Sequence, residues 1–146
     1  MTVYVDTSVL GAYYCPEPLS LVAERTLRRL TFPAISELTL VEFASAISRK
    51  VREKTLSRES ATRVTAQFEA HLEDDYYEIL SVKARDYRLA KSWLGQLHGT
   101  LRSLDALHLA VAEAAGATIV TADRRLAAEA RRLGVSVRLL VMGRVV

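Results

Sequence analysis

Four acidic residues could supply the chemistry of this sequence. Asp6 and Asp123 each follow a short hydrophobic run, Glu42 lies within a helical pattern, and Asp105 lies close to the start of another. Carboxylates that lie close together repel one another and raise each other's pKa unless a cation neutralises them. Hard divalent ions such as Mg²⁺ and Mn²⁺ prefer oxygen ligands, and two such ions about 4 Å apart can activate water and stabilise the leaving oxygen of a phosphodiester. A fold that gathers these four acids would therefore create a metal site suited to phosphodiester hydrolysis.

Each acid also has a purely structural explanation. Asp6 and Asp123 stand where a helix N-cap is expected, and Asp105 in a first helical turn is favoured by the helix dipole. Glu42 points away from the expected core face of its helix and could simply be solvated. That core face consists of Leu40, Phe43, Ala44, Ile47 and Val51, at helical spacing. The metal hypothesis therefore rests on the four acids as a set.

The elements that must position these acids alternate along the chain. Hydrophobic patterns, caps and breakers predict strands over 2–6, 32–35, 76–80, 117–121 and 135–141. They predict helices over about 7–14, 19–30, 36–54, 58–72, 84–97, 104–115 and 123–133. Alternating strands and helices indicate an α/β fold, a three-layer sandwich with a central, mostly parallel sheet flanked by helices. In such folds ligands bind beyond the carboxyl ends of the strands, where strand order reverses. Asp6 and Asp123 are expected at that edge.

Composition bounds the class of protein. A length of 146 residues with 50% hydrophobic and 25% charged residues predicts one globular domain over 1–146. No apolar run approaches the roughly 18 residues of a membrane span, and the start of the chain does not resemble a signal peptide. Cys15 is the only cysteine, which excludes an internal disulfide and favours the cytoplasm. With four of the 17 acids assigned to metal, 20 basic residues face 13 acids, and this surplus of seven favours a polyanionic partner.

Four short motifs, in this order, resemble those of the PIN-domain family, and specifically its VapC-type toxins of toxin–antitoxin pairs. The opening motif is Val-Asp-Thr-Ser-Val-Leu over 5–10, and the second is Ser-Glu-Leu-Thr-Leu-Val-Glu over 36–42. The third is Leu-Asp-Ala-Leu-His-Leu-Ala over 104–110, and the last is Val-Thr-Ala-Asp over 120–123. Each motif alone is weak, but their order and the chain length together make the resemblance specific.

This resemblance implies a five-stranded parallel sheet and a set of site residues. It implies that the metal ligands are the four acids Asp6, Glu42, Asp105 and Asp123, with Ser8 and Thr121 as supporting polar groups. It further implies Mg²⁺- or Mn²⁺-dependent endonucleolytic cleavage of RNA, a homodimer, and a cognate antitoxin as partner.

The sequence departs from the family pattern after the last motif. Many relatives carry another acid there, whereas this chain has Arg124 and Arg125. Occupancy of a second metal site is therefore open. Guanidinium groups pair with phosphate in a bidentate manner, so these arginines could contact the RNA backbone or could simply be solvated.

Several alternatives stay open at this stage. An RNA-processing PIN nuclease without an antitoxin, or a non-catalytic binding module with this fold, would share the motifs. An aspartyl phosphatase would carry a second acid where this chain has Ser8. Histidine-based cleavage would need a pairing that His71, His98 and His108 do not show in sequence, and we expect His108 to be packed. Trp93, Leu89 and Leu97 recur at helical spacing and are expected in the core.

Overall fold

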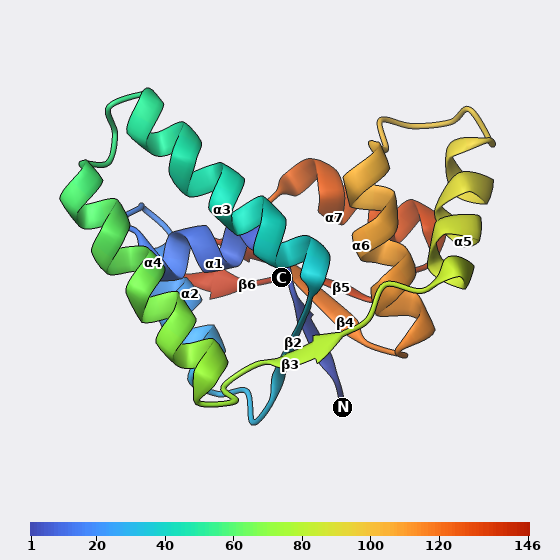
Figure 1. Cartoon of the computed structure of the whole chain (residues 1–146). Helices are drawn as coiled ribbons and strands as arrows, with labels where there is room; N and C mark the ends of the chain where they lie inside the picture. Colours follow the sequence, from blue (N-terminus) through green and yellow to red (C-terminus); the bar gives the residue numbers. More distant parts are fainter.

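A sheet of short strands, of which the central ones are buried, forms the centre of the molecule (Figure 1). The computed structural model describes residues 1–146. The strands are β1 (Val3–Val5), β2 (Pro33–Ser36), β3 (Glu78–Leu80), β4 (Thr118–Thr121), β5 (Val137–Val141) and β6 (Arg144–Val145). The sheet order is β3-β2-β1-β4-β5-β6, and the first five strands are parallel. The predicted, mostly parallel α/β sheet is thus confirmed.

The sixth strand was not predicted. β6 pairs antiparallel with β5, through Leu140 opposite Val145 and Val141 opposite Arg144. Gly143, at a φ of 78°, lies in the turn between the two strands. A two-residue strand is too short to produce an alternating pattern, so the sequence carried no signal for it.

The strand order reverses between β1 and β4. β2 and β3 lie on one side of β1, and β5 lies beyond β4. Val5 at the end of β1 pairs with Val120 of β4, and the backbone N–H of Asp6 donates to the Val120 carbonyl at 3.0 Å. The carboxyl ends of these two strands therefore meet at the switch point, where α/β sheets bind ligands.

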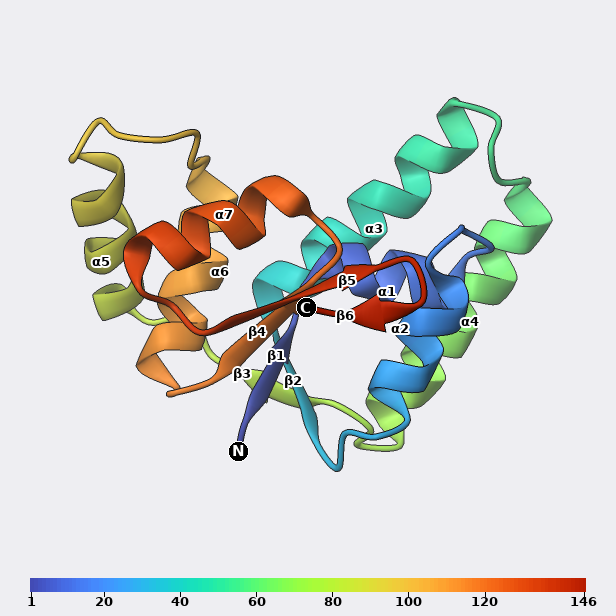
Figure 2. The ribbon, with the colours of Figure 1, turned by 180° about the vertical axis from the view of Figure 1, so that it is seen from behind.

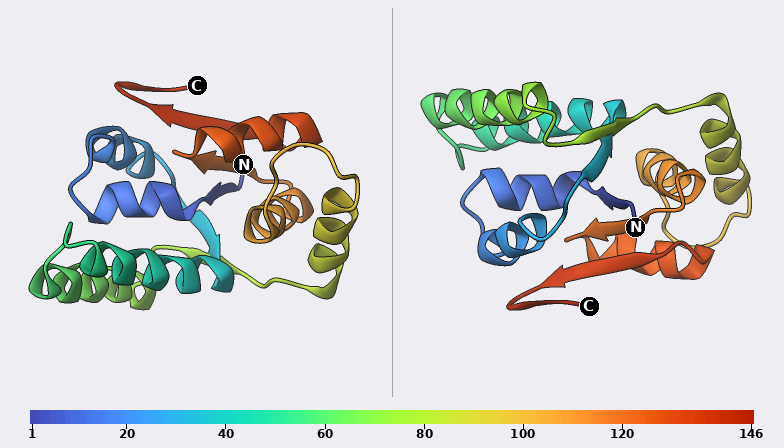
Figure 3. Two further views of the ribbon diagram at one scale, coloured as in Figure 1. Left: turned by 90° about the horizontal axis from the view of Figure 1, so that it is seen from above. Right: turned by 90° about the horizontal axis from the view of Figure 1, so that it is seen from below.

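Helices cover both faces of the sheet, giving the predicted three layers (Figure 3). On one face lie α1 (Thr7–Tyr14) and α2 (Ser20–Leu27), and α1 also packs on α3 (Glu37–Arg52) and α4 (Arg58–Glu73). On the other lie α5 (Ala84–Leu94), α6 (Ser103–Ala114) and α7 (Arg124–Leu133). Side chains that alternate along β1 serve both cores, since Val3 and Val5 pack on the first side and Tyr4 on the second. None of the helices has both the length and the apolar character needed to cross a bilayer.

The ends of the helices follow from local chemistry, but several come earlier than predicted: α2 ends at Leu27 rather than at 30, and α3 ends at Arg52 rather than at 54. Gly134 adopts a left-handed conformation at φ 75° and ends α7. α5 ends at Leu94, three residues earlier than predicted, and Gly95 follows it. Leu97 has a φ of 60° and is 90% exposed, so its predicted place in the core is wrong. Trp93 is buried in the second core and Leu89 packs against it, as predicted.

Two helices project from the body of the molecule as a pair. Figures 1 and 2 show α3 and α4 lying side by side, away from the second core on α5–α7. Ser57 caps α4 by accepting a hydrogen bond from the Ser60 N–H at 3.1 Å, which fixes the turn between the two helices. The base of α3 carries Glu42 toward the sheet, while its outer half faces α4.

Candidate active site

Asp6 ends β1 with its side chain tied to the neighbouring strand. It is 6% exposed and caps α1. Its Oδ2 accepts hydrogen bonds from the Ser8 hydroxyl at 2.5 Å, the Thr121 hydroxyl at 2.8 Å and the Ser8 N–H at 3.3 Å. Its Oδ1 accepts no hydrogen bond and is available to a ligand. The structure therefore places Ser8 and Thr121, both candidates from the sequence, directly on Asp6.

Asp123 occupies the equivalent position after β4. Its Oδ1 caps α7 by accepting from the N–H groups of Arg125 at 2.8 Å and Leu126 at 3.2 Å. Its own N–H donates to the Thr121 hydroxyl oxygen at 3.0 Å. Thr121 thus connects the two aspartates, because its hydroxyl donates to Asp6 and accepts from Asp123. The N-cap explanation is correct for both acids, yet each retains one carboxylate oxygen without a hydrogen bond.

Asp105 lies in the first turn of α6 and is affected by all three other acids. Burial, then the negative charges of Asp123, Asp6 and Glu42, raise the pKa of its carboxyl above the ordinary value. Arg125 opposes this shift, with its Nη2 3.9 Å from Asp105 Oδ2. The raised pKa indicates negative charge that the surrounding protein compensates only in part.

Glu42 turns toward the sheet rather than into solvent. Its side chain is 25% exposed, and Thr7 at the start of α1 donates to its Oε1 at 3.2 Å. His108 Nε2 forms a second, short hydrogen bond with the same oxygen. The helix α3 therefore presents Glu42 to the first residue of α1 and to His108 in the middle of α6.

The four acids share one edge of the sheet without forming a closed cage. No group of three or more Asp, Glu, His or Cys side chains is placed so that it could hold a metal ion without movement. The chemistry of the donors nevertheless fits a hard divalent cation, because all four are carboxylates and the negative charge around Asp105 is compensated only in part.

The two arginines after Asp123 differ in their surroundings. Arg124 is exposed and makes no ion pair, whereas Arg125 is partly buried and lies beside Asp105. Both belong to the first turn of α7, whose N-terminus carries partial positive charge. They add cationic groups at the rim of the acidic edge.

Sequence reasoning missed a buried polar chain behind Glu42. His108 is 1% exposed, as its predicted packing required, but it also hydrogen bonds to Glu42 and, through Nδ1, to the Tyr4 hydroxyl at 2.6 Å. Tyr4 in turn contacts Ser36 at 2.8 Å and Thr39 at 3.2 Å. The three-residue spacing of Ser36, Thr39 and Glu42 was visible in the sequence. The contribution of Tyr4 was not, because only the sheet brings it opposite α3.

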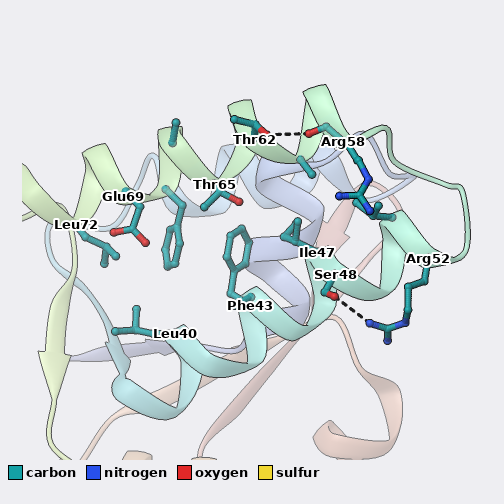
Figure 4. Close-up of a pocket in the computed structure, with 15 residues that line it drawn as sticks. Leu40, Phe43, Ile47, Ser48, Arg52, Arg58, Thr62, Thr65, Glu69 and Leu72 are labelled. Carbon is teal, nitrogen blue, oxygen red and sulfur yellow. Dashed lines mark hydrogen bonds between the residues drawn. The ribbon is translucent and has the colours of Figure 1, made fainter.

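A wide groove lies apart from these acids, between α3 and α4 (Figure 4). It encloses about 790 Å³, and Glu42 is not among its lining residues. Phe43 and Ile47 are buried at its floor, but Ala44, which the sequence placed in the core, is exposed on its wall. Arg52 and Arg58 lie at its outer end.

Comparisons with known proteins place the chain in a family. A PIN-domain family model matches residues 3–132. No curated protein matches the sequence.

Three solved structures illustrate the likeness of fold. The first is VapBC2 from Rickettsia felis bound to promoter DNA, with a TM-score of 0.67 and 18% identity over 94% of this chain and 97% of that one. VapC20 from Mycobacterium tuberculosis, described as a toxin that cleaves the sarcin–ricin loop, has a TM-score of 0.68 and 19% identity over 87% and 94%. DNA-bound VapBC from Salmonella typhimurium has a TM-score of 0.68 and 17% identity over 97% and 99%. At these identities the likeness establishes the fold.

Proposed function

The chain belongs to the PIN-domain family, and on that basis we propose that it is a divalent-metal-dependent endoribonuclease and the toxin of a VapBC-type toxin–antitoxin pair. The observation that carries this proposal is the raised pKa of Asp105, which burial and then the negative charges of Asp123, Asp6 and Glu42 produce near the switch point of the sheet. The solved structures of similar fold include a toxin that cleaves the sarcin–ricin loop and two DNA-bound VapBC proteins, which supports the same assignment.

Asp6, Glu42, Asp105 and Asp123 would hold the ion, Mg²⁺ or Mn²⁺. When bound, such an ion polarises the scissile phosphate and lowers the pKa of water to produce a nucleophile near neutral pH. Asp6 and Asp123 would present the oxygens that make no hydrogen bond. Ser8 and Thr121 hold the Asp6 carboxylate by its other oxygen, which limits its rotation.

The chain's own cations would position the RNA. Arg124 is exposed and free to pair with a phosphate, while Arg125 can contact either Asp105 or a phosphate that approaches it. Because Arg125 attracts both the substrate and Asp105, it would keep the phosphodiester close to the carboxylates. A non-catalytic module would have no use for acids kept at this energetic cost, so we favour catalysis.

The cleavage test uses purified protein and a labelled single-stranded RNA. We expect Mg²⁺ or Mn²⁺ to support cleavage, EDTA to stop it, and Asp6→Asn or Asp105→Asn to abolish it without loss of folded structure. Asp74→Asn is the matched control, because Asp74 is an exposed aspartate at the end of α4. Cleavage that resists EDTA, or full activity in the Asp6→Asn and Asp105→Asn double variant, contradicts the proposal.

The proposed antitoxin needs a surface on this chain, and the groove between α3 and α4 offers one. Its floor is apolar and its outer end carries Arg52 and Arg58. These features suit an amphipathic segment with an apolar face and acidic residues at one end.

We further propose a homodimer and a cytoplasmic location, where the buried thiol of Cys15 would stay reduced. An RNA-processing enzyme without an antitoxin is the alternative, and it predicts no neighbouring gene for a small binding partner.

A further inference from the structure

A continuous chain of hydrogen bonds runs from Glu42 into the interior of the protein. Glu42 Oε1 bonds to His108 Nε2, and His108 Nδ1 lies 2.6 Å from the Tyr4 hydroxyl. That hydroxyl lies 2.8 Å from the Ser36 hydroxyl and 3.2 Å from the Thr39 hydroxyl. Behind Glu42 every member is 1% exposed or less. The hydrogen bonds connect four elements: they run from α3 through α6 to β1, and from there to Ser36 at the end of β2 and Thr39 in the first turn of α3.

The directions of these hydrogen bonds follow from the chemistry of their ends. An ionised Glu42 can only accept, so Nε2 of His108 must carry the proton that it donates. Burial raises the pKa of Tyr4 to about 12, so its hydroxyl keeps its proton at neutral pH. In a neutral ring, Tyr4 donates to Nδ1 and accepts from Ser36 and Thr39. If the His108 ring is charged, its Nδ1 donates to the Tyr4 hydroxyl instead. Whether the ring is neutral or charged, its Nε2 donates to Glu42.

Glu42 has no other firm anchor near the site. It lies mid-helix on a side chain with three rotatable bonds, and its remaining partner is the Thr7 hydroxyl at 3.2 Å. Both contacts are made by Oε1, so Oε2 is left for a ligand. Asp6 shows the same division, with hydrogen bonds on Oδ2 only. His108 therefore does for Glu42 what Ser8 and Thr121 do for Asp6.

We propose that His108 is a positioning residue that fixes the Glu42 carboxylate for divalent-cation binding, and that Tyr4 locks the His108 ring in the required orientation. This inference rests on the proposed function for its metal, but the hydrogen-bond arrangement itself can be tested without metal. Partners of this kind behind a metal ligand typically change metal affinity by about 10–100-fold.

The first experiment measures Mn²⁺ affinity by titration calorimetry on wild type and three variants. His108→Leu removes the donor to Glu42 and should weaken Mn²⁺ binding by about 10–100-fold. His108→Gln can still place an N–H near Glu42 and should recover most of that loss. Tyr4→Phe keeps the aromatic ring of residue 4 but removes the hydroxyl that orients the His108 ring. The Mn²⁺ affinity of this variant should therefore fall between those of His108→Leu and His108→Gln. Near-UV circular dichroism tests whether each variant is folded. If His108→Leu does not fold, the comparison of His108→Gln and Tyr4→Phe with wild type still tests the proposal, because these two substitutions disturb the packing less.

The second experiment uses ¹⁵N NMR of the histidine ring in metal-free protein. A proton on His108 Nε2 that shifts in the Glu42→Gln variant supports the arrangement, and a ring without a proton on Nε2 overturns it. Wild-type Mn²⁺ affinity in folded His108→Leu, or a Gln variant no better than Leu, also overturns the positioning role. If wild type binds no Mn²⁺ at all, the proposed function fails instead, and the NMR result decides whether His108 holds Glu42.

Discussion

Asp6 and Asp123 each use one carboxylate oxygen for the fold and leave the other free. The Oδ2 of Asp6 accepts from Ser8 and Thr121, and the Oδ1 of Asp123 accepts from two backbone N–H groups of α7. A helix cap and a metal ligand are therefore compatible roles for one side chain. For this reason the cap explanation, although correct, does not weaken the functional one.

Asp105 provides a test of the carboxylate cluster that does not depend on activity. Because burial and three neighbouring acids raise its pKa, ionised Asp105 opposes folding, and that penalty is present at neutral pH. We expect Asp105→Asn to raise the melting temperature at pH 7 in EDTA. The gain should shrink as the pH falls through the raised pKa of folded Asp105 toward the ordinary aspartate pKa of about 3.9, and it should be absent below that value, where the wild-type carboxyl is protonated in both states.

Thermal unfolding followed by circular dichroism from pH 3 to pH 8 measures this effect. Adding Mn²⁺ at pH 7 should reverse the order of the two proteins, because the ion stabilises only a form that binds it. A variant that is less stable than wild type in EDTA at pH 7 contradicts the idea that the acids crowd one another.

At the scale of elements, the sequence predicted the parallel strands and most helices, because hydrophobic periodicity and caps are local signals. It missed β6, which is too short to show alternation, and it extended α5 past Gly95 because Leu97 happened to continue the helical spacing. The acids at the strand ends were identifiable for the same local reason. The chain from Glu42 through His108 to Tyr4 was not, because it depends on contacts between residues up to 104 positions apart.

The loop between α5 and α6 is held to α7 by Glu129. This buried carboxylate accepts from Arg132 Nη2 at 2.7 Å and from the Thr100 N–H at 3.0 Å, and these bonds lower its pKa. Gly99 must be glycine here, since its φ is 75° and a Cβ would lie 2.4 Å from Glu129 Oε1. We expect Glu129→Gln to lower the free energy of unfolding by about 1–3 kcal/mol at pH 7.

The pH dependence follows from the lowered pKa of Glu129. Its stabilisation is complete above the ordinary glutamate pKa of about 4.3 and is lost as the pH falls through the lower folded value. Urea unfolding at pH 7, 5, 4 and 3 should therefore show the gap between wild type and Glu129→Gln narrowing only at the acid end. Glu113→Gln, at an exposed position of α6, is the control. A gap that does not change with pH would mean that the ionised carboxylate is not the source of the stability.

The α3–α4 pair should bind the antitoxin, and charge introduced into its groove tests this. Ala44 and Ala66 are exposed residues of its two walls, so Ala44→Asp or Ala66→Asp should leave the protein folded and place an unpaired charge against an apolar partner. Co-expression with the product of an adjacent short reading frame, followed by co-purification, measures the loss of complex. Ala70→Asp, on α4 outside the groove, is the matched control. Equal recovery of partner with all three variants would place the antitoxin elsewhere.

At the scale of the whole molecule, the net charge of +3 understates the attraction that we propose for RNA. Four of the 17 acids lie at the carboxyl edge of the sheet, so the remaining surface is more basic than the total suggests. Phosphate contacts release counterions, and for single strands each contributes about 0.7 to the slope of log affinity against log salt concentration. Salt dependence therefore counts the phosphates that the protein contacts.

Removal of Arg124 and Arg125 should reduce that slope. We expect the double Arg→Ala variant to lose about 1.4 from the slope, two contacts at about 0.7 each, when RNA binding is measured in EDTA by fluorescence anisotropy. A double variant of Arg49 and Arg63, exposed on α3 and α4, changes the net charge equally and should leave the slope unchanged. Equal slopes for the two double variants would show that Arg124 and Arg125 are ordinary solvated residues.

The most direct test of the four-carboxylate site is a crystal structure with Mn²⁺, read by anomalous scattering. We predict a peak at the carboxyl ends of β1 and β4, within coordination distance of oxygens from at least Asp6 and Asp105, with the side chains rotated toward it. The peak should be absent in Asp6→Asn crystals treated in the same way. Crystals at saturating Mn²⁺ with no peak at this edge, or with one bound only elsewhere, would contradict the account.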